Sequence, residues 1–294
     1  MYFKDILLAI FVALLWGFNF VVMKVGIQEI PPILFVATRS LFAIFPLIFF
    51  IPKPSVSWRM IIGIGCFLGI LTFLFILMGL HLGITGTLTS LVVQTQAFFT
   101  VIFAFLFLGE RFKFYQILGM IISFTGILVI GLDQFWMRSF FGIICVLLGA
   151  ASWGWANVLM KKAGVSNINM FHLMVWVSLI PPVPLILYAI YMDGVPEILY
   201  VFSNASMLSY GTLIYSGMIS GVLGYALWGY LLKKYSASSV ASFSMLVPVF
   251  ATCFSVPIFH ETFTTSMILG AIFVALGLMV NQFLPKLMRK VIHR

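Results

Sequence analysis

The sequence predicts an all-α integral membrane protein with ten transmembrane helices, arranged as two inverted five-helix repeats. Hydrophobic residues make up 63% of the 294-residue chain and charged residues only 8%, whereas soluble domains contain about 45–50% and about 25%. Ten apolar runs are long enough to cross a bilayer, which takes about 20 residues each. The two halves of the chain also share ordered motifs, which indicates an internal repeat.

The composition excludes a soluble enzyme, a disordered chain and a nucleic-acid-binding domain, because no soluble core of this size hides so much apolar surface. The formal charge of +9 instead indicates basic residues that meet the anionic headgroups of a lipid bilayer. The three cysteines lie singly in separate apolar runs and form no metal-binding pattern. Neither a metal nor a cofactor is therefore expected.

The predicted spans follow one another with short breaks that contain proline, glycine or charged residues. They cover residues 5–26, 31–51, 59–81, 85–108, 114–132, 140–162, 169–191, 208–231, 237–259 and 265–286. Only the 192–207 loop is long enough to hold a further surface segment. The first run lacks a small-residue cleavage site, which predicts a retained first helix and not a signal peptide.

Basic residues predict the orientation of these spans. With a cytoplasmic N-terminus, thirteen of the sixteen basic residues lie at cytoplasmic helix ends and only Lys24 and Arg138 at outer ends. Arg39 is left inside the second span. Because lysine and arginine concentrate on the cytoplasmic side, both termini are predicted to be cytoplasmic.

Two pairs of matching segments carry the repeat. Residues 16–24 match residues 153–161 with five of nine positions identical, and the motif around Glu110 recurs around Glu261. The match divides the chain into residues 1–138 and residues 139–294. Since each half has an odd number of spans, the halves would have opposite orientations, as in secondary transporters that alternate access around a central site.

A Trp-Gly pair recurs near the middle of spans one and six, and Gly-Glu-Arg at residues 109–111 follows span four. With ten spans in two inverted five-span halves, these motifs make the chain similar to the EamA family of the drug/metabolite transporter superfamily. The likeness is greatest for bacterial exporters of O-acetylserine and cysteine, and it is carried by residues 16–26, 90–100, 175–181, 224–229 and 246–248. The resemblance implies export of small amino-acid metabolites across the bacterial inner (cytoplasmic) membrane.

Polar side chains at membrane depth are costly, so each is a candidate for the transport pathway. Arg39 lies about eight residues into the second span, roughly 12 Å deep at a rise of about 1.5 Å per residue. Its guanidinium would bind a carboxylate through two hydrogen bonds; a bond to helix carbonyls and snorkelling are the alternatives. The repeat matches Arg39 with Trp176, so only one half carries the charge.

Two Trp–Asn pairs form the second group of candidates. Trp16, Asn19 and Phe20 share one face of span one by their helical spacing. Trp153 and Asn157 share one face of span six. An amide beside an indole suits a small zwitterion, and the alternative is that the amides only join helices.

Further candidates lie in spans four, eight and nine. Gln94 and Gln96 are two residues apart and point in different directions, so at most one faces a shared cavity, and Gln94 is the candidate. Tyr225 and Trp228 would form another wall, although aromatic side chains also pack internally or face lipid. Ser244 is the candidate on span nine.

Two features are predicted to be structural. Glu110 and Glu261 would cap the starts of spans five and ten, where a helix N-terminus favours negative charge. Glycines in GxxxG spacing permit close helix contact, and they are Gly65, Gly69, Gly217 and Gly221.

No acidic residue lies at mid-membrane in the predicted spans, so the expected partner is a neutral or zwitterionic metabolite with a carboxylate. A single chain carries both repeats, so a monomer is expected. The alternative functions are export of other amphipathic metabolites such as aromatic amino acids, a membrane-embedded enzyme, and a channel. Scattered histidines argue against an enzyme, and the lack of charged rings argues against a channel.

Overall fold

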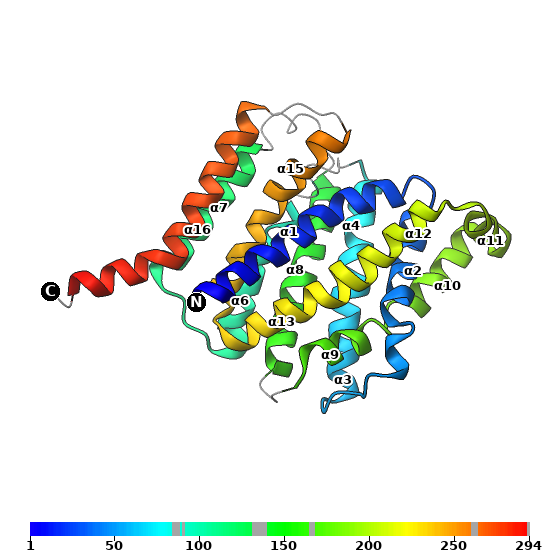
Figure 1. Ribbon diagram of the computed structural model, residues 1–294, viewed down its shortest axis with the longest axis horizontal. Coiled ribbons are helices and arrows are strands. Elements are labelled where there is room, and N and C mark those ends of the chain that lie inside the picture. The colour runs from blue at the N-terminus through cyan, green and yellow to red at the C-terminus, as the bar shows by residue number, and fades with distance from the viewer. Residues whose placement is uncertain (84–88, 90–91, 131–139, 165–167, 260–263, 293–294) are drawn as a thin grey trace.

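The computed structural model describes residues 1–83, 89, 92–130, 140–164, 168–259 and 264–292. In these residues every regular element is a helix (Figure 1). Six helical stretches of the described chain have at least 18 residues and are apolar enough to cross a membrane. The all-helical prediction is therefore confirmed, and the apolar helices support a multi-pass membrane protein.

The first half of the chain forms helices within each predicted run. They are α1 (Phe3–Gly26), α2 (Pro32–Ile44), η1 (Leu47–Phe49), α3 (Trp58–Ile64), η2 (Gly65–Leu71), α4 (Thr72–His81), α6 (Gln96–Leu108) and α7 (Phe114–Ile130). Local sequence explains two of the helix ends. Ser57 caps α3 by accepting from the N–H of Met60 at 3.3 Å, and Gly109 ends α6 in a left-handed conformation at φ +66°.

The second half of the described chain contains more helical elements than the first. Its helices are α8 (Phe140–Gly164), α9 (Met170–Val177), α10 (Pro182–Asp193), α11 (Val195–Asn204), α12 (Met207–Ile214), η4 (Tyr215–Gly224), α13 (Tyr225–Lys234), α14 (Ala237–Ala241), η5 (Ser242–Leu246), α15 (Val247–Phe259) and α16 (Thr265–Ile292). Of these elements, α11 occupies the long predicted loop and has no buried residue.

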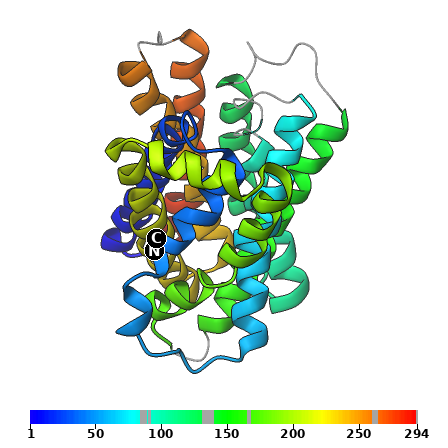
Figure 2. The same cartoon turned by 90° about the vertical axis from the view of Figure 1, so that its right-hand side faces the viewer.

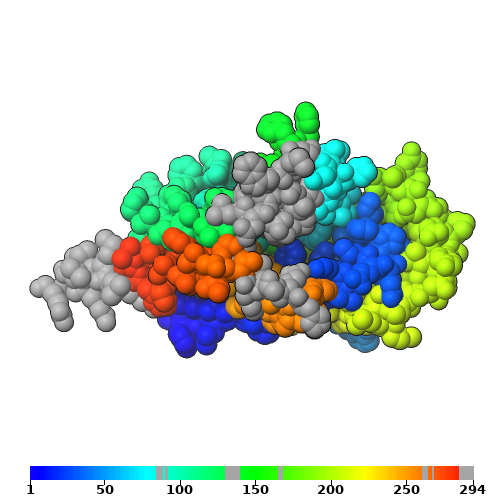
Figure 3. All heavy atoms as spheres, turned by 90° about the horizontal axis from the view of Figure 1, so that it is seen from above, coloured from blue at the N-terminus to red at the C-terminus, as the bar shows by residue number. Residues whose placement is uncertain are grey.

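The helices form two layers that lie side by side (Figure 2). In one layer α1 packs against α15 and η4, and in the other α8 packs against α4 and α6. α7 and α16 pack together at one end of the long axis, and α10 and α11 lie at the other end (Figures 1 and 3). Near that second end, α2 contacts both α10 and η4.

Glycines let the two π-helical segments, η2 and η4, approach neighbouring helices closely. A β-carbon at Gly69 would lie 2.2 Å from Cγ of Pro181, and one at Gly217 would lie 2.0 Å from the carbonyl oxygen of Arg39. Gly65 similarly approaches Ile180. The close contacts predicted from the GxxxG spacing are confirmed at these three positions.

A network of charged and polar groups ties together the helix ends near the start of α1. Lys161 of α8 pairs with Glu110, which also accepts from the N–H of Ala237 at 2.9 Å. Glu110 therefore caps α14, and the prediction that it caps α7 is wrong, because folding brings the turn after α13 within its reach. Gln116 caps α7 instead by accepting from the N–H of Lys113 at 2.9 Å. Glu261 lies outside the described residues.

The same network extends to α1 through Asp5. This buried carboxylate accepts from Lys234 at 2.9 Å and from the hydroxyl of Tyr235. Lys161 donates to the carbonyl of Tyr235. One short turn after α13 is thus held by charged groups from α1, α8 and the end of α6.

At the other end of α1, Glu29 fastens the α1–α2 connection to the start of α12. Its Oε2 accepts from the N–H of Ser206 and from the hydroxyl of Ser209, each at 2.7 Å. These hydrogen bonds, that of the Ser206 N–H above all, hold the pKa of Glu29 below its ordinary value.

We expect Gly217→Ala to destabilise the protein by about 1–3 kcal/mol, because its methyl group would overlap the Arg39 carbonyl and force η4 away from α2. Thermal unfolding in detergent measures the loss. Gly211→Ala is the matched control, since a β-carbon there meets nothing within 4 Å and alanine is the better helix former. Equal unfolding temperatures for both variants would contradict the close-contact argument.

We expect the stabilising effect of Glu29 to depend on pH. A carboxyl group with a lowered pKa stabilises the fold only while it is ionised. The difference in unfolding temperature between the native protein and Glu29→Gln should therefore be present near neutral pH. It should vanish as the pH falls through the lowered pKa of Glu29. A difference that stays constant down to about pH 3 would show that the charge of Glu29 does not matter.

Candidate functional site

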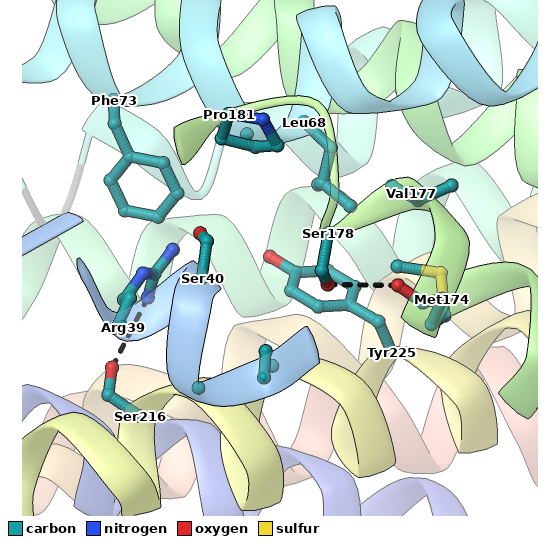
Figure 4. A pocket seen from close by; sticks show the side chains of 14 residues that line it. Arg39, Ser40, Leu68, Phe73, Met174, Val177, Ser178, Pro181, Ser216 and Tyr225 are labelled. Atoms are coloured by element: carbon teal, nitrogen blue, oxygen red, sulfur yellow. Dashed lines mark hydrogen bonds between the residues drawn. The ribbon is translucent and has the colours of Figure 1, made fainter. Parts of the chain in front are cut away.

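A cavity lies where four helical stretches cross (Figure 4). Its walls come from α2, from η2 and α4, from α9 and Pro181, and from η4 with the first residue of α13. Its empty volume is about 430 Å³, including the part open to the outside. The polar or aromatic lining residues are Arg39, Ser40, Phe73, Ser178, Ser216 and Tyr225, and the other described lining residues are apolar or glycine. We call this space the Arg39 cavity.

Arg39 is the one charged side chain among the described residues that line this cavity. Its Nη1 donates to the hydroxyl of Ser216 at 3.3 Å, and its guanidinium carbon lies 4.2 Å from the centroid of the Phe73 ring. No carboxylate of the described chain forms an ion pair with it. A guanidinium has five N–H donors, so most of them remain for a ligand.

The serine hydroxyls of the cavity are mainly acceptors. Ser40 donates to the carbonyl of Val36 at 3.2 Å, and Ser178 donates to the carbonyl of Met174 at 2.9 Å. Each donation uses the single hydroxyl hydrogen and leaves lone pairs free. Tyr225 points its hydroxyl into the cavity (Figure 4), where it is available as donor or acceptor.

Tyr225 also belongs to an aromatic cluster beside the cavity. The ring centroid of Trp16 lies 4.8 Å from that of Tyr225, 5.0 Å from that of Trp228 and 5.7 Å from that of Trp153. The indole N–H of Trp16 donates to the carbonyl of Ser220 in the π-helical segment η4 at 3.1 Å. The cluster thus joins side chains from α1, α8 and α13 at one wall of the site.

Behind this cluster lies a fully buried amide network centred on Asn157 of α8. Its Nδ2 donates to Gln96 at 3.1 Å and to Thr100 at 3.0 Å. Its Oδ1 accepts from the indole N–H of Trp228 at 3.1 Å, and Gln96 donates in turn to Ser244 at 2.7 Å. The network joins α6, α8, α13 and η5. Its members already satisfy one another, so they are available to a ligand only if these bonds break.

Three other buried polar atoms of the predicted site have no hydrogen-bond partner: Asn19 Oδ1, Gln94 Oε1 and the indole nitrogen of Trp153. An unpaired buried polar group costs about 1–3 kcal/mol. Native proteins contain few such groups, and those present often have a functional reason. Trp153 belongs to the aromatic cluster, and Asn19 follows Trp16 by one helical turn on α1.

The structure separates the predicted site residues into three groups. Arg39 and Tyr225 line the cavity, with Trp16, Trp153 and Trp228 clustered beside Tyr225. The second group, Asn157 and Ser244, belongs to the amide network. The third comprises Asn19 and Gln94, which are buried without a partner for the side-chain oxygen, and Phe20, which is 38% exposed on the surface of α1.

Sequence reasoning missed Phe73 and Ser216, which contact Arg39 directly, and the serines at positions 40 and 178. Serine is common in helices and ordinarily hydrogen-bonds its own backbone. A serine in an apolar run therefore does not indicate a binding site. Spacing could have indicated Phe73, because it follows Gly69 by one helical turn and Gly69 was predicted to contact another helix. Among the described residues, no group of three or more His, Cys, Asp or Glu side chains could hold a metal ion.

Apolar helices around a cavity with a few polar groups are typical of small-molecule transporters. Comparison of the sequence with protein families agrees with that class. The chain belongs to the EamA-like transporter family, which it matches over residues 3–132 and 140–282.

Relatives that are similar over nearly the whole chain include two with the same description. The chain is 32% identical over 284 residues to a probable amino-acid metabolite efflux pump of Escherichia coli (strain K12), covering 95% of each chain. It is 34% identical over 286 residues to a protein of the same description from Salmonella typhimurium, again covering 95% of each. A crystal structure with 16% identity matches with a TM-score of 0.75 over 96% of this chain and 99% of its own, which shows the fold alone.

We expect Gln96→Met to destabilise the protein by about 1–3 kcal/mol, because it leaves the amide of Asn157 and the hydroxyl of Ser244 with fewer partners in a buried setting. Gln94→Met is the matched control, since it removes a side chain whose oxygen already has no partner. Unfolding temperatures in detergent compare the two. If Gln94→Met destabilises as much as Gln96→Met, the network around Asn157 is not what stabilises this region.

Proposed function

We infer that the protein is a secondary transporter that exports small amino-acid metabolites of the cysteine and O-acetylserine kind. The observation that carries this proposal is the Arg39 guanidinium, which lines a cavity between apolar helices and has no carboxylate partner in the described chain. Such a group is costly at membrane depth, and ionisable residues there commonly mark a substrate pathway. The descriptions of the two relatives from Escherichia coli and Salmonella typhimurium support the substrate class.

The proposed architecture is ten spans in two inverted halves, residues 1–138 and residues 139–294. Equivalent contacts support it. Gly17 of α1 approaches Phe250 of α15, and Gly154 of α8 approaches Phe99 of α6. The two contacts are related by the same residue shifts as the motifs that define the repeat. Inverted halves of this kind would rock around a site at their interface.

The Arg39 cavity fits such an interface, because two pairs of lining residues occupy equivalent places. Ser40 corresponds to Ser178, and Phe73 corresponds to Tyr225. This register differs by one residue from the register of the Trp-Gly motifs, so Val177 would be the counterpart of Arg39 in place of Trp176. Either way, only one half contributes a charge.

We place both termini in the cytoplasm and the protein in the bacterial inner membrane, from the distribution of lysine and arginine. The network of Asp5, Glu110, Lys161 and Lys234 would then lie at the cytoplasmic end. It ties α1, α6 and α8 to the turn between α13 and α14. These bonds would have to break for the cavity to open inward, so the network fits a closed cytoplasmic side in an alternating-access cycle.

In the proposed complex, the substrate carboxylate replaces water around Arg39 and forms two hydrogen bonds with its guanidinium. The rest of a zwitterionic metabolite would lie against Tyr225 and, beyond it, the aromatic cluster around Trp16. Aromatic faces attract ammonium groups. The same aromatic wall is the feature that favours aromatic amino acids as an alternative cargo. A single chain supplies every proposed contact, so we expect a functional monomer without a cofactor.

We expect Arg39→Ala to lower transport of carboxylate-bearing substrates about ten-fold or more, because a charge-assisted bidentate contact is lost. The measurement is counterflow in proteoliposomes, with unlabelled cysteine or O-acetylserine inside and labelled substrate outside. Arg59→Ala is the control, since this exposed arginine at the start of α3 lies outside the cavity. It should transport like the native protein.

Two results would count against the proposal. Unchanged counterflow by folded Arg39→Ala would remove Arg39 from the site while leaving the transporter fold intact. No counterflow of either substrate by the folded native protein would remove the cysteine and O-acetylserine class. Repeating the native measurement with an imposed pH gradient then tests whether net flux is coupled to protons.

A further inference from the structure

The described lining of the Arg39 cavity carries one positive charge and no negative charge. Arginine stays protonated in proteins, so the described lining by itself is a monocation within an apolar fold. The ion pairs Lys161–Glu110 and Lys234–Asp5 lie elsewhere and do not offset it. The ligand must therefore supply whatever charge balances Arg39.

The net charge of the complex depends on the form of the ligand nitrogen. A ligand with one carboxylate and an uncharged nitrogen neutralises Arg39, and the occupied cavity has no net charge. A zwitterion adds an ammonium group, so the occupied cavity remains a monocation. Because a net charge in an apolar interior is costly, the neutral complex is favoured.

The hydrogen-bonding groups opposite Arg39 agree with an uncharged nitrogen. Ser40 and Ser178 give their hydrogens to their own helices and offer only lone pairs to the cavity. Tyr225 adds one hydroxyl (Figure 4). Neutral acceptors such as these satisfy an amide N–H, whereas an ammonium group would gain more from a carboxylate, and none lines the described cavity. The face of Phe73 is already occupied by Arg39.

We propose that the Arg39 cavity selects by net charge and prefers a carboxylate-bearing metabolite with an uncharged nitrogen, such as an N-acylated amino acid, over a zwitterionic amino acid. This inference rests on the proposed function, because it concerns the cargo of the same site. Arg39 holds the carboxylate, and the single amide N–H donates to one of the hydroxyls of Ser40, Ser178 and Tyr225.

Two isomers provide the test. N-acetyl-L-serine and O-acetyl-L-serine contain the same atoms, but the first is a monoanion and the second a zwitterion. At about pH 6 the amine of O-acetylserine stays protonated, which also slows its conversion to the N-acetyl isomer. Counterflow in proteoliposomes should show half-saturation for N-acetylserine at a concentration about ten-fold or more below that for O-acetylserine.

Variants at Arg39 test whether the preference between the isomers comes from the charge of this residue or from its shape. Arg39→Gln leaves a cavity without charge, in which the zwitterion forms the neutral complex, so the ten-fold preference should disappear or reverse. Arg39→Lys keeps the charge and should keep the preference, although both isomers bind less tightly. The methyl ester of N-acetylserine has no carboxylate, and it should compete poorly in the native protein.

Each outcome decides between the two proposals. Native protein that transports O-acetylserine as well as or better than N-acetylserine overturns charge selection and leaves the proposed function standing. A preference that is unchanged in folded Arg39→Gln shows that Arg39 does not create it, which also overturns the inference. If neither isomer is transported by folded native protein, the proposed function fails with it.

Discussion

The centre of the fold depends on the hydrogen bonds made by the side-chain amide of Asn157. It is fully buried, and it hydrogen-bonds Gln96, Thr100 and Trp228. In an apolar interior each of these groups would be costly to leave unpaired, so their mutual satisfaction fixes α6, α8 and α13 relative to one another. Trp228 then packs on Trp16, and Trp16 packs on Tyr225 at the cavity wall. A structural amide thereby sets the position of a wall that a ligand would touch.

The cavity itself results from backbone contacts between helices. Gly69 and Gly217 lie in π-helical segments and bring η2 against Pro181 and η4 against the backbone of α2. π-helical turns are rare and are frequently found at functional sites. Four helical stretches thus cross within a small volume, while the lining side chains leave space between them. The same glycines therefore bring the backbones into close contact and leave space for a ligand beside them.

Much of this arrangement could be predicted from the sequence, because strong physical costs leave strong patterns. An arginine in an apolar run is conspicuous, and Arg39 does line a cavity. The recurring Trp-Gly pair pointed to Trp16 and Trp153, which do meet. The partners of Arg39 could not be predicted, since Ser216 is an ordinary helical serine and only tertiary packing brings it to α2. Glu110 was assigned to the helix that follows it, because sequence shows the next residues in the chain and not the turn at Tyr235.

Arg39 is the single charged residue of the described cavity lining, whereas the proposed repeat pairs Ser40 with Ser178 and Phe73 with Tyr225. The helix contacts and the charge of the cavity therefore depend on different residues. A change at Gly69 or Gly217 disturbs a close contact between helical stretches, so these positions tolerate little change. A change at Arg39 alters the charge of the cavity with one substitution and needs no compensating change in the other half. A single substitution at Arg39 can therefore change which cargo the cavity accepts while the fold stays the same.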